Sequence, residues 1–225
     1  MTDVMIPGSP GELLAYVARP VESAPWPGVV VLHDAAGMSQ DLRNQADWLA
    51  SEGFLAAAPD LYYPGGKIAC IRAMIRDATA RQGKFVADIE ATRTWLSRQE
   101  GCTDKIGVIG FCMGGSYAMA LPCVSRDIKA AAPFYGEIPP DEKLQNLNCP
   151  VFYAYGENDG WIQRKDVDRL AGALRKFNKP GEVKVYSGCS HGFFNDTRAD
   201  VYSAKDARDA WERSLKLFEQ NLKHR

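Results

Sequence analysis

Short apolar runs alternate along the chain with segments in which apolar residues recur every three or four positions. The runs are continuous rather than alternating with polar residues, and such runs are typical of strands buried on both faces of a parallel sheet. They predict strands over residues 28–33, 54–58, 105–109, 127–134, 150–155 and 182–186. A further run, Leu13 to Arg19, predicts an early edge strand.

The segments between these runs have helical periodicity. They predict helices over residues 39–53, 84–99, 116–121, 162–177 and 204–222, with a shorter helix over 68–82 and a loop rich in Tyr, Pro and Gly over 60–67. Ser39 is a suitable N-cap for the first of these helices. The alternation of strands and helices predicts an α/β fold: one domain over residues 1–225, with a mostly parallel central sheet and helices on both faces.

The composition is that of an ordinary soluble globular protein. The chain has 225 residues, 46% hydrophobic and 24% charged, with a formal net charge of −1. This charge balance argues against nucleic acid or an anionic membrane surface as a partner, and no apolar stretch approaches the ~18 residues that span a bilayer. Met1 to Met5 lacks the features of a signal peptide, so we expect a cytoplasmic protein, either a monomer or a weak homo-oligomer.

Cysteine and histidine spacing argues against disulfides and metal sites. The six cysteines form no C-x-x-C pair in a chain of this size, so reduced thiols are the better interpretation and structural zinc is not expected. The three histidines are His33, His191 and His224, which cannot form an H-E-x-x-H motif. We therefore expect neither a metal nor an organic cofactor.

The residues after the run 105–109 carry the strongest chemical signal. Gly110-Phe111-Cys112-Met113-Gly114 stands between a predicted strand and a predicted helix. This is the context in which G-x-S-x-G forms a nucleophile elbow, with cysteine here in place of serine. A small buried core cysteine is the alternative, but the elbow favours Cys112 as a nucleophile.

Two more reactive side chains follow later strands. Asp159 comes after the run 150–155 and His191 after the run 182–186, so nucleophile, acid and base occur in the α/β-hydrolase order. Active groups collect at the carboxyl ends of such strands. We expect His191 to deprotonate the thiol and later activate water, and Asp159 to fix its tautomer. Glu157 and Asp166 are the alternatives for the acid.

Other groups complete the expected site. The amides of Met113 and Ala35 are the candidates for an oxyanion hole, and the helix after Cys112 should lower the pKa of its thiol. His33 either lines the pocket or holds its loop by hydrogen bonds. Several aromatic residues could line the pocket or simply pack in the core, and Trp161, beside Asp159, is the best candidate: Tyr63, Tyr135, Trp161, Phe193 and Phe194.

The sequence resembles the dienelactone hydrolase family, the cysteine branch of the α/β-hydrolases. The matching segments lie in order between residues 28 and 196: Val29 to Asp34 with Gly37, Ala58 to Tyr62, Gly107 to Gly115, Tyr135-Gly136, Gly156 to Asp159, and His191 to Phe193. The resemblance implies a Cys-Asp-His triad and hydrolysis of 4-carboxymethylenebut-2-en-4-olide to maleylacetate.

The resemblance also implies two further site features. A carboxylate two residues past the oxyanion strand contacts the resting thiol; it is usually Glu, and here it is Asp34. Arginines hold the substrate carboxylate, one of them four residues after the catalytic histidine, where this chain has Asn195. Arg198 is nearby. Arg72 and Arg76, spaced like neighbours on a helix, could bind an anion or belong to a solvated helix face.

Three functions remain open from the sequence. The leading one is a lactone hydrolase acting through a thioester intermediate on a small-molecule substrate. A general carboxylesterase would use the same residues on neutral esters. A non-catalytic or redox-sensing thiol protein could keep the same fold, because fold does not determine function.

Overall fold

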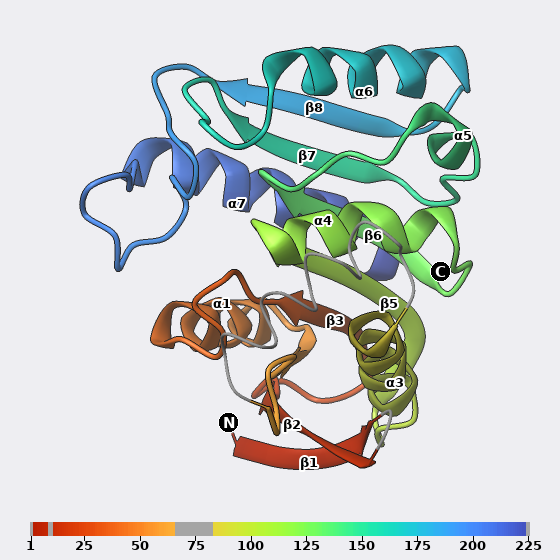
Figure 1. Ribbon diagram of the computed structural model, residues 1–225. Coiled ribbons are helices and arrows are strands. Elements are labelled where there is room, and N and C mark those ends of the chain that lie inside the picture. The colour runs from red at the N-terminus through yellow and green to blue at the C-terminus, as the bar shows by residue number, and fades with distance from the viewer. Residues whose placement is uncertain (1, 9–10, 66–82, 224–225) are drawn as a thin grey trace.

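The computed structural model describes residues 2–8, 11–65 and 83–223, which form one eight-stranded sheet with helices on both faces (Figure 1). In spatial order the strands are β1 (Thr2–Gly8), β2 (Gly11–Ala18), β4 (Leu55–Pro59), β3 (Trp26–Leu32), β5 (Cys102–Phe111), β6 (Ile128–Phe134), β7 (Val151–Gly156) and β8 (Gly181–Tyr186). The pairings β1–β2 and β2–β4 are antiparallel, and all other neighbours are parallel. This is the α/β-hydrolase architecture predicted from the strand–helix alternation.

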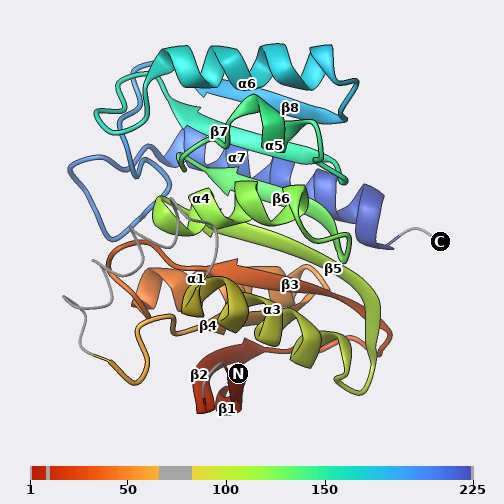
Figure 2. The same ribbon diagram turned by 45° about the vertical axis from the view of Figure 1, so that its right-hand side comes forward.

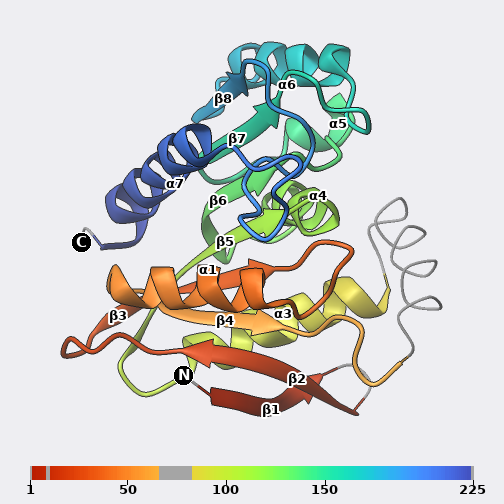
Figure 3. The same cartoon turned by 90° about the vertical axis from the view of Figure 1, so that its left-hand side faces the viewer.

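The two faces of the sheet carry separate helical layers. Helices α3 (Lys84–Ser97), α4 (Met113–Ala120) and α6 (Arg164–Lys176) cover one face (Figure 2). Helices α1 (Gln40–Ser51) and α7 (Ala204–Phe218) cover the other (Figure 3). The Ser39 side chain accepts a hydrogen bond from the Leu42 amide at 3.2 Å, which confirms the predicted N-cap of α1.

Shorter elements complete the chain. They are α5 (Asp141–Leu144), a 3₁₀ turn over Leu121–Cys123 and a π-helical turn over Glu219–Lys223. The π turn continues α7, so the predicted helix over 204–222 ends in a different helical form. The predicted helix over 68–82 lies outside the described residues.

One prediction about the sheet edge is wrong. Leu13 to Arg19 was expected to be an edge strand, but β1 pairs along the whole length of β2 and is itself the edge. Ile6 is the one residue of β1 that is buried, so this strand lacks the apolar run by which a strand is recognised.

Helix α4 begins earlier than its sequence indicates. The periodicity favours a start at Ser116, whereas the helix starts at Met113, directly after Cys112. Gly114 and Gly115 are poor helix formers, so the first turn of the helix cannot be recognised from the sequence. Tertiary contact explains why glycine is there: a Cβ at Gly114 would lie 2.3 Å from the Leu32 oxygen, and one at Gly110 would lie 2.2 Å from the Gly114 oxygen. The first turn of α4 therefore lies with its main chain against the ends of β3 and β5.

This close approach predicts a large cost for a single methyl group. Gly114→Ala should lower the free energy of unfolding by about 3 kcal/mol, because the clash is with main-chain atoms that cannot rotate away. The matched control is Gly172→Ala in α6, where a Cβ meets no atom within 4 Å. In Gly172→Ala the free energy of unfolding should rise by about 0.5–1 kcal/mol, because alanine has a higher helix propensity than glycine.

Urea denaturation of the two variants and the wild type measures both changes. Equal stabilities for Gly114→Ala and Gly172→Ala would contradict the proposed main-chain contact. A change in the denaturation slope would point instead to an altered unfolded state.

Candidate active site

Cys112 stands at a strained turn between β5 and α4. Its φ is 56° and its ψ −114°, values that a residue with a side chain rarely adopts. The Cys112 amide donates to the Phe134 oxygen at 3.0 Å, and the Ser116 amide donates to the Cys112 oxygen at 3.0 Å, which holds the turn on both sides. Strained backbone of this kind is concentrated at functional sites, and this geometry is that of a nucleophile elbow.

His191 and Asp159 form a hydrogen-bonded pair beside this turn. The His191 Nδ1 and an Asp159 carboxylate oxygen are 2.8 Å apart. The other carboxylate oxygen accepts the amides of Trp161 and Ile162 at 2.8 and 2.9 Å, and the Asp159 side chain is fully buried. Asp159 is thus held by its own turn, and Nε2 is the ring nitrogen left for chemistry.

Opposing effects determine the protonation of His191. Burial lowers its pKa, but the Asp159 hydrogen bond and the neighbouring Cys112 outweigh burial and raise the pKa from 6.5 to about 9. The His191 Nε2 is closed off from solvent and makes no well-formed hydrogen bond to a described residue. The Cys112 thiol and the imidazole are therefore neighbours that are not joined by a well-formed hydrogen bond. Catalytic hydrogen bonds are often loose before substrate binds. The raised pKa favours an imidazolium beside the Cys112 sulfur.

The loop after β3 lies opposite Cys112. The Ala35 oxygen accepts the Tyr62 hydroxyl at 3.2 Å, and an Asp34 carboxylate oxygen accepts the Ala36 amide at 2.7 Å, so the loop is fixed. Met113 is the first residue of α4, and its amide has no carbonyl one turn earlier in the helix. The two amides expected to form an oxyanion hole therefore come from elements that flank the thiol.

Cys112, His191 and the loop residues Asp34 and Ala35 line one pocket of about 350 Å³. It lies at the carboxyl ends of the parallel strands, which point to the left in Figure 1. A cavity of this size suits a small ligand. Its described lining residues are Asp34, Ala35, Cys112, Tyr135, Asn158, Gly160, Trp161, Ser190, His191, Gly192, Asn195, Arg198 and Val201.

Trp161 lies at the mouth of this pocket. Its indole stacks on the His191 ring at 5.6 Å between centroids, with 76% of the residue exposed. His33 and Phe193, also candidates for the pocket, lie behind its wall instead. His33 is buried, with Nδ1 2.6 Å from the Asp34 oxygen and Nε2 accepting the Leu61 amide, and therefore holds its loop.

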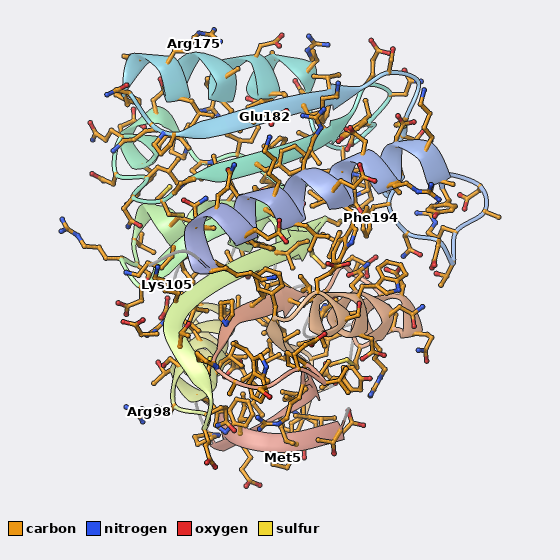
Figure 4. All side chains as sticks on the ribbon, turned by 180° about the vertical axis from the view of Figure 1, so that it is seen from behind. Met5, Arg98, Lys105, Arg175, Glu182 and Phe194 are labelled. Carbon is orange, nitrogen blue, oxygen red and sulfur yellow. The ribbon has the colours of Figure 1, made fainter. Side chains whose placement is uncertain are left out.

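Phe193 and Phe194 pack in the core. Phe193 is fully buried and contacts the rings of Tyr135 and Tyr186. Phe194 lies between α1 and α7, where it contacts the rings of Trp48 and Trp211 (Figure 4). Phe193 and Phe194 therefore anchor the His191 loop to the hydrophobic core.

The alternatives for the acid lie elsewhere. Glu157 accepts the Ser187 hydroxyl and the Gly188 amide, and Asp166 lies in the first turn of α6 near Arg169. Arg76 and Arg72 lie outside the described residues. Among lining residues that the sequence did not single out, Asn158, Gly160 and Ser190 are direct neighbours of Asp159 and His191, and this adjacency was the available signal.

The described ranges contain no cluster of three or more His, Cys, Asp or Glu side chains arranged to hold a metal ion. Within the same ranges, no helix is long and apolar enough to cross a membrane. Five cysteines are described, all as free thiols, and Cys70 lies outside these ranges.

The model of the dienelactone hydrolase family matches residues 13–222 of this sequence. The chain belongs to the dienelactone hydrolase family. The resemblance seen in the sequence motifs is thereby confirmed over nearly the whole chain.

Individual relatives agree with this assignment. A protein named "Putative carboxymethylenebutenolidase" from Escherichia coli K12 is 32% identical, covering 96% of this chain and 85% of the relative. The Usf protein of Aquifex pyrophilus is 34% identical, covering 92% and 93%. The crystal structure of a "Putative Dienelactone Hydrolase" from Klebsiella pneumoniae superposes with a TM-score of 0.88 at 28% identity, covering 97% and 98%.

The His191–Asp159 pair predicts a measurable change in proton affinity. The His191 pKa should be about 9 in the wild type, so the ring is protonated at pH 7 and loses its proton as the pH rises through 9. Asp159→Asn removes the carboxylate charge, so this pKa should fall below its wild-type value, although Cys112 still raises it against the effect of burial. NMR titration of the imidazole measures both values, and an unchanged His191 pKa in Asp159→Asn would contradict the pairing.

Proposed function

We propose that this protein hydrolyses a small lactone or ester through a Cys112–His191–Asp159 triad and a thioester intermediate. The observation that carries the proposal is the strained Cys112 turn beside a buried His191 whose Nδ1 is paired with Asp159. A thiol at such a turn, next to a helix N-terminus and a protonated imidazole, has the surroundings that favour the reactive thiolate.

The proposed reaction proceeds in two steps. The Cys112 thiolate attacks the lactone carbonyl, while the amides of Met113 and Ala35 stabilise the oxyanion. The ring C–O bond breaks, and His191 donates its Nε2 proton to the leaving oxygen, which stays tethered to the acyl group. His191 then removes a proton from water, the resulting hydroxide attacks the thioester, and the thiolate leaves as the carboxylic acid forms.

Asp34 is proposed to regulate the resting thiol. It lines the same pocket as Cys112, and one carboxylate oxygen is occupied by the Ala36 amide. The other oxygen makes no hydrogen bond to a described residue, which leaves it available to accept the Cys112 S–H before substrate arrives. This contact would stabilise the protonated thiol and so oppose the thiolate that the neighbouring imidazolium favours.

An anionic lactone of the carboxymethylenebutenolide type is the proposed substrate class. The names of the relatives point to it, and the pocket offers a cation, Arg198. Asn195, at the expected arginine position, instead uses its side-chain oxygen to accept the Thr197 amide and hydroxyl. The turn that it stabilises brings Arg198, three residues later, to the pocket wall.

Two alternatives make different predictions. A general carboxylesterase would prefer neutral esters over anionic lactones. A redox-sensing thiol protein would show reversible oxidation of Cys112 and negligible ester turnover.

The nucleophile assignment predicts loss of turnover in one variant and not in its control. Cys112→Ala should lower kcat for an activated aryl ester by about a thousandfold or more while the protein stays folded. Cys102→Ala is the matched control, because Cys102 is a partly exposed thiol at the opposite end of the same strand. Steady-state kinetics measures the turnover of both variants, and circular dichroism shows whether they are folded. Near wild-type activity in Cys112→Ala would overturn the proposed triad.

The anionic-lactone assignment predicts a substrate-dependent effect of Arg198. Arg198→Gln should raise KM about fivefold for 4-carboxymethylenebut-2-en-4-olide and much less for 4-methylenebut-2-en-4-olide, which lacks the carboxylate. Arg164→Gln is the control, since Arg198 and Arg164 have similar exposure and each pairs with an aspartate on the surface, but Arg164 does not line the pocket. Equal effects on both lactones, or a wild-type preference for neutral esters, would exclude the assigned substrate class.

A further inference from the structure

Tyr135 has an unusual backbone conformation next to the active site. It follows β6, lines the pocket with Cys112 and His191, and is 3% exposed. Its φ is 38°, in the left-handed region where a bulky residue is a genuine outlier. An outlier of this kind costs free energy and persists only where the surroundings impose it.

The neighbouring main chain imposes this conformation. The Tyr135 amide donates to the Ala154 oxygen at 2.8 Å, and the Tyr153 hydroxyl donates to the Gly136 oxygen at 2.5 Å. Gly136 is pressed against α4 so closely that a Cβ there would lie 2.2 Å from the Gly115 carbonyl carbon. The direction of the Tyr135 side chain is therefore fixed by both β7 and α4.

The hydroxyl of Tyr135 differs from those of five other buried tyrosines. The hydroxyls of Tyr16, Tyr62, Tyr153, Tyr155 and Tyr186 each donate to a carboxylate or a carbonyl. The Tyr135 hydroxyl makes no hydrogen bond to any residue that the structure describes.

This hydroxyl is nevertheless open to solvent. The described buried polar atoms that lack both a partner and solvent contact are Asp41 Oδ1, Gln45 Oε1 and His191 Nε2. The Tyr135 hydroxyl is not among them, so it reaches solvent, and the pocket that Tyr135 lines provides the route. A hydroxyl that makes no hydrogen bond to the described protein and borders the pocket is placed to bind a ligand.

The surroundings keep this hydroxyl protonated. Burial, and then the negative charges of Asp34, Asp41 and Cys112, raise the pKa of Tyr135 well above 10. A phenol in this state donates a hydrogen bond and does not act as a base at neutral pH. It can also approach an anion without adding positive charge to the site.

We propose that the Tyr135 hydroxyl donates a hydrogen bond to the substrate carboxylate and so positions the lactone ring over Cys112. The inference rests on the proposed function. The reacting carbonyl is assigned to the amides of Ala35 and Met113, so the phenol serves a different oxygen of the substrate. Hydrogen bonds to an ionised acceptor are the stronger ones, which favours the carboxylate. Tyr135 is thus a positioning residue that determines specificity.

The test compares two lactones in two variants. Tyr135→Phe removes only the hydroxyl, and should raise KM about tenfold for 4-carboxymethylenebut-2-en-4-olide with kcat changed less than about twofold. The effect on 4-methylenebut-2-en-4-olide should be several times smaller. Tyr186→Phe is the control, since it removes a hydroxyl that pairs with Asp209 outside the pocket. Equal changes for both lactones, or none, would overturn the proposal.

A second measurement separates this proposal from the proposed function. Iodoacetate and iodoacetamide alkylate Cys112 without turnover, and they differ in having a carboxylate or an amide. The ratio of their rates, corrected with Cys112→Ser, should fall about fivefold in Tyr135→Phe. A fall in this ratio would support the Tyr135 contact, even if the wild type opened neither lactone. An unchanged ratio would refute the contact, even if Cys112 proved essential for hydrolysis.

Discussion

The active site depends on contact between main chains, without side chains in between. The first turn of α4 lies on the ends of β3, β5 and β6, and Gly110, Gly114 and Gly115 leave no room there for a Cβ. Because the end of β5 and the start of α4 are so close, the chain between them must turn sharply. Cys112 forms this turn in a strained conformation, with a φ of 56°. The same contact continues to Gly136 and so fixes Tyr135. One packing constraint therefore orients both the thiol and the phenol.

Charge is arranged around this rigid frame. Asp159 is buried and fully hydrogen-bonded, so it can raise the proton affinity of His191 without moving. In the proposed mechanism the N-terminus of α4 and the imidazolium favour a negative sulfur, while Asp34 opposes it. Tyr135 adds a donor that carries no charge. The pocket thus combines the proposed thiolate nucleophile with groups that can accept an anionic ligand.

The fold could largely be predicted from the sequence, because apolar runs mark buried strands. So could the proximity of Cys112, Asp159 and His191, because these residues follow three such runs. What could not be predicted depends on tertiary contact. β1 has a single buried residue, and the glycines that start α4 are favourable only against β3 and β5. Trp161 lies two residues after Asp159, and Phe193 lies two residues after His191. Trp161 nevertheless stacks on a ring that lines the pocket, whereas Phe193 is buried in the core. The conformation of each turn decides such differences.

The indole of Trp161 has a thermodynamic consequence. It is an apolar surface left in water beside a reacting group, with 76% of the residue exposed. A ligand that covers part of this ring on entering the pocket removes more apolar area from water than its own surface alone contributes. Burial of apolar surface lowers the heat capacity, so the enthalpy of binding becomes more favourable as temperature rises. The affinity for a ligand therefore depends in part on the water that is released from the surface of Trp161 on binding.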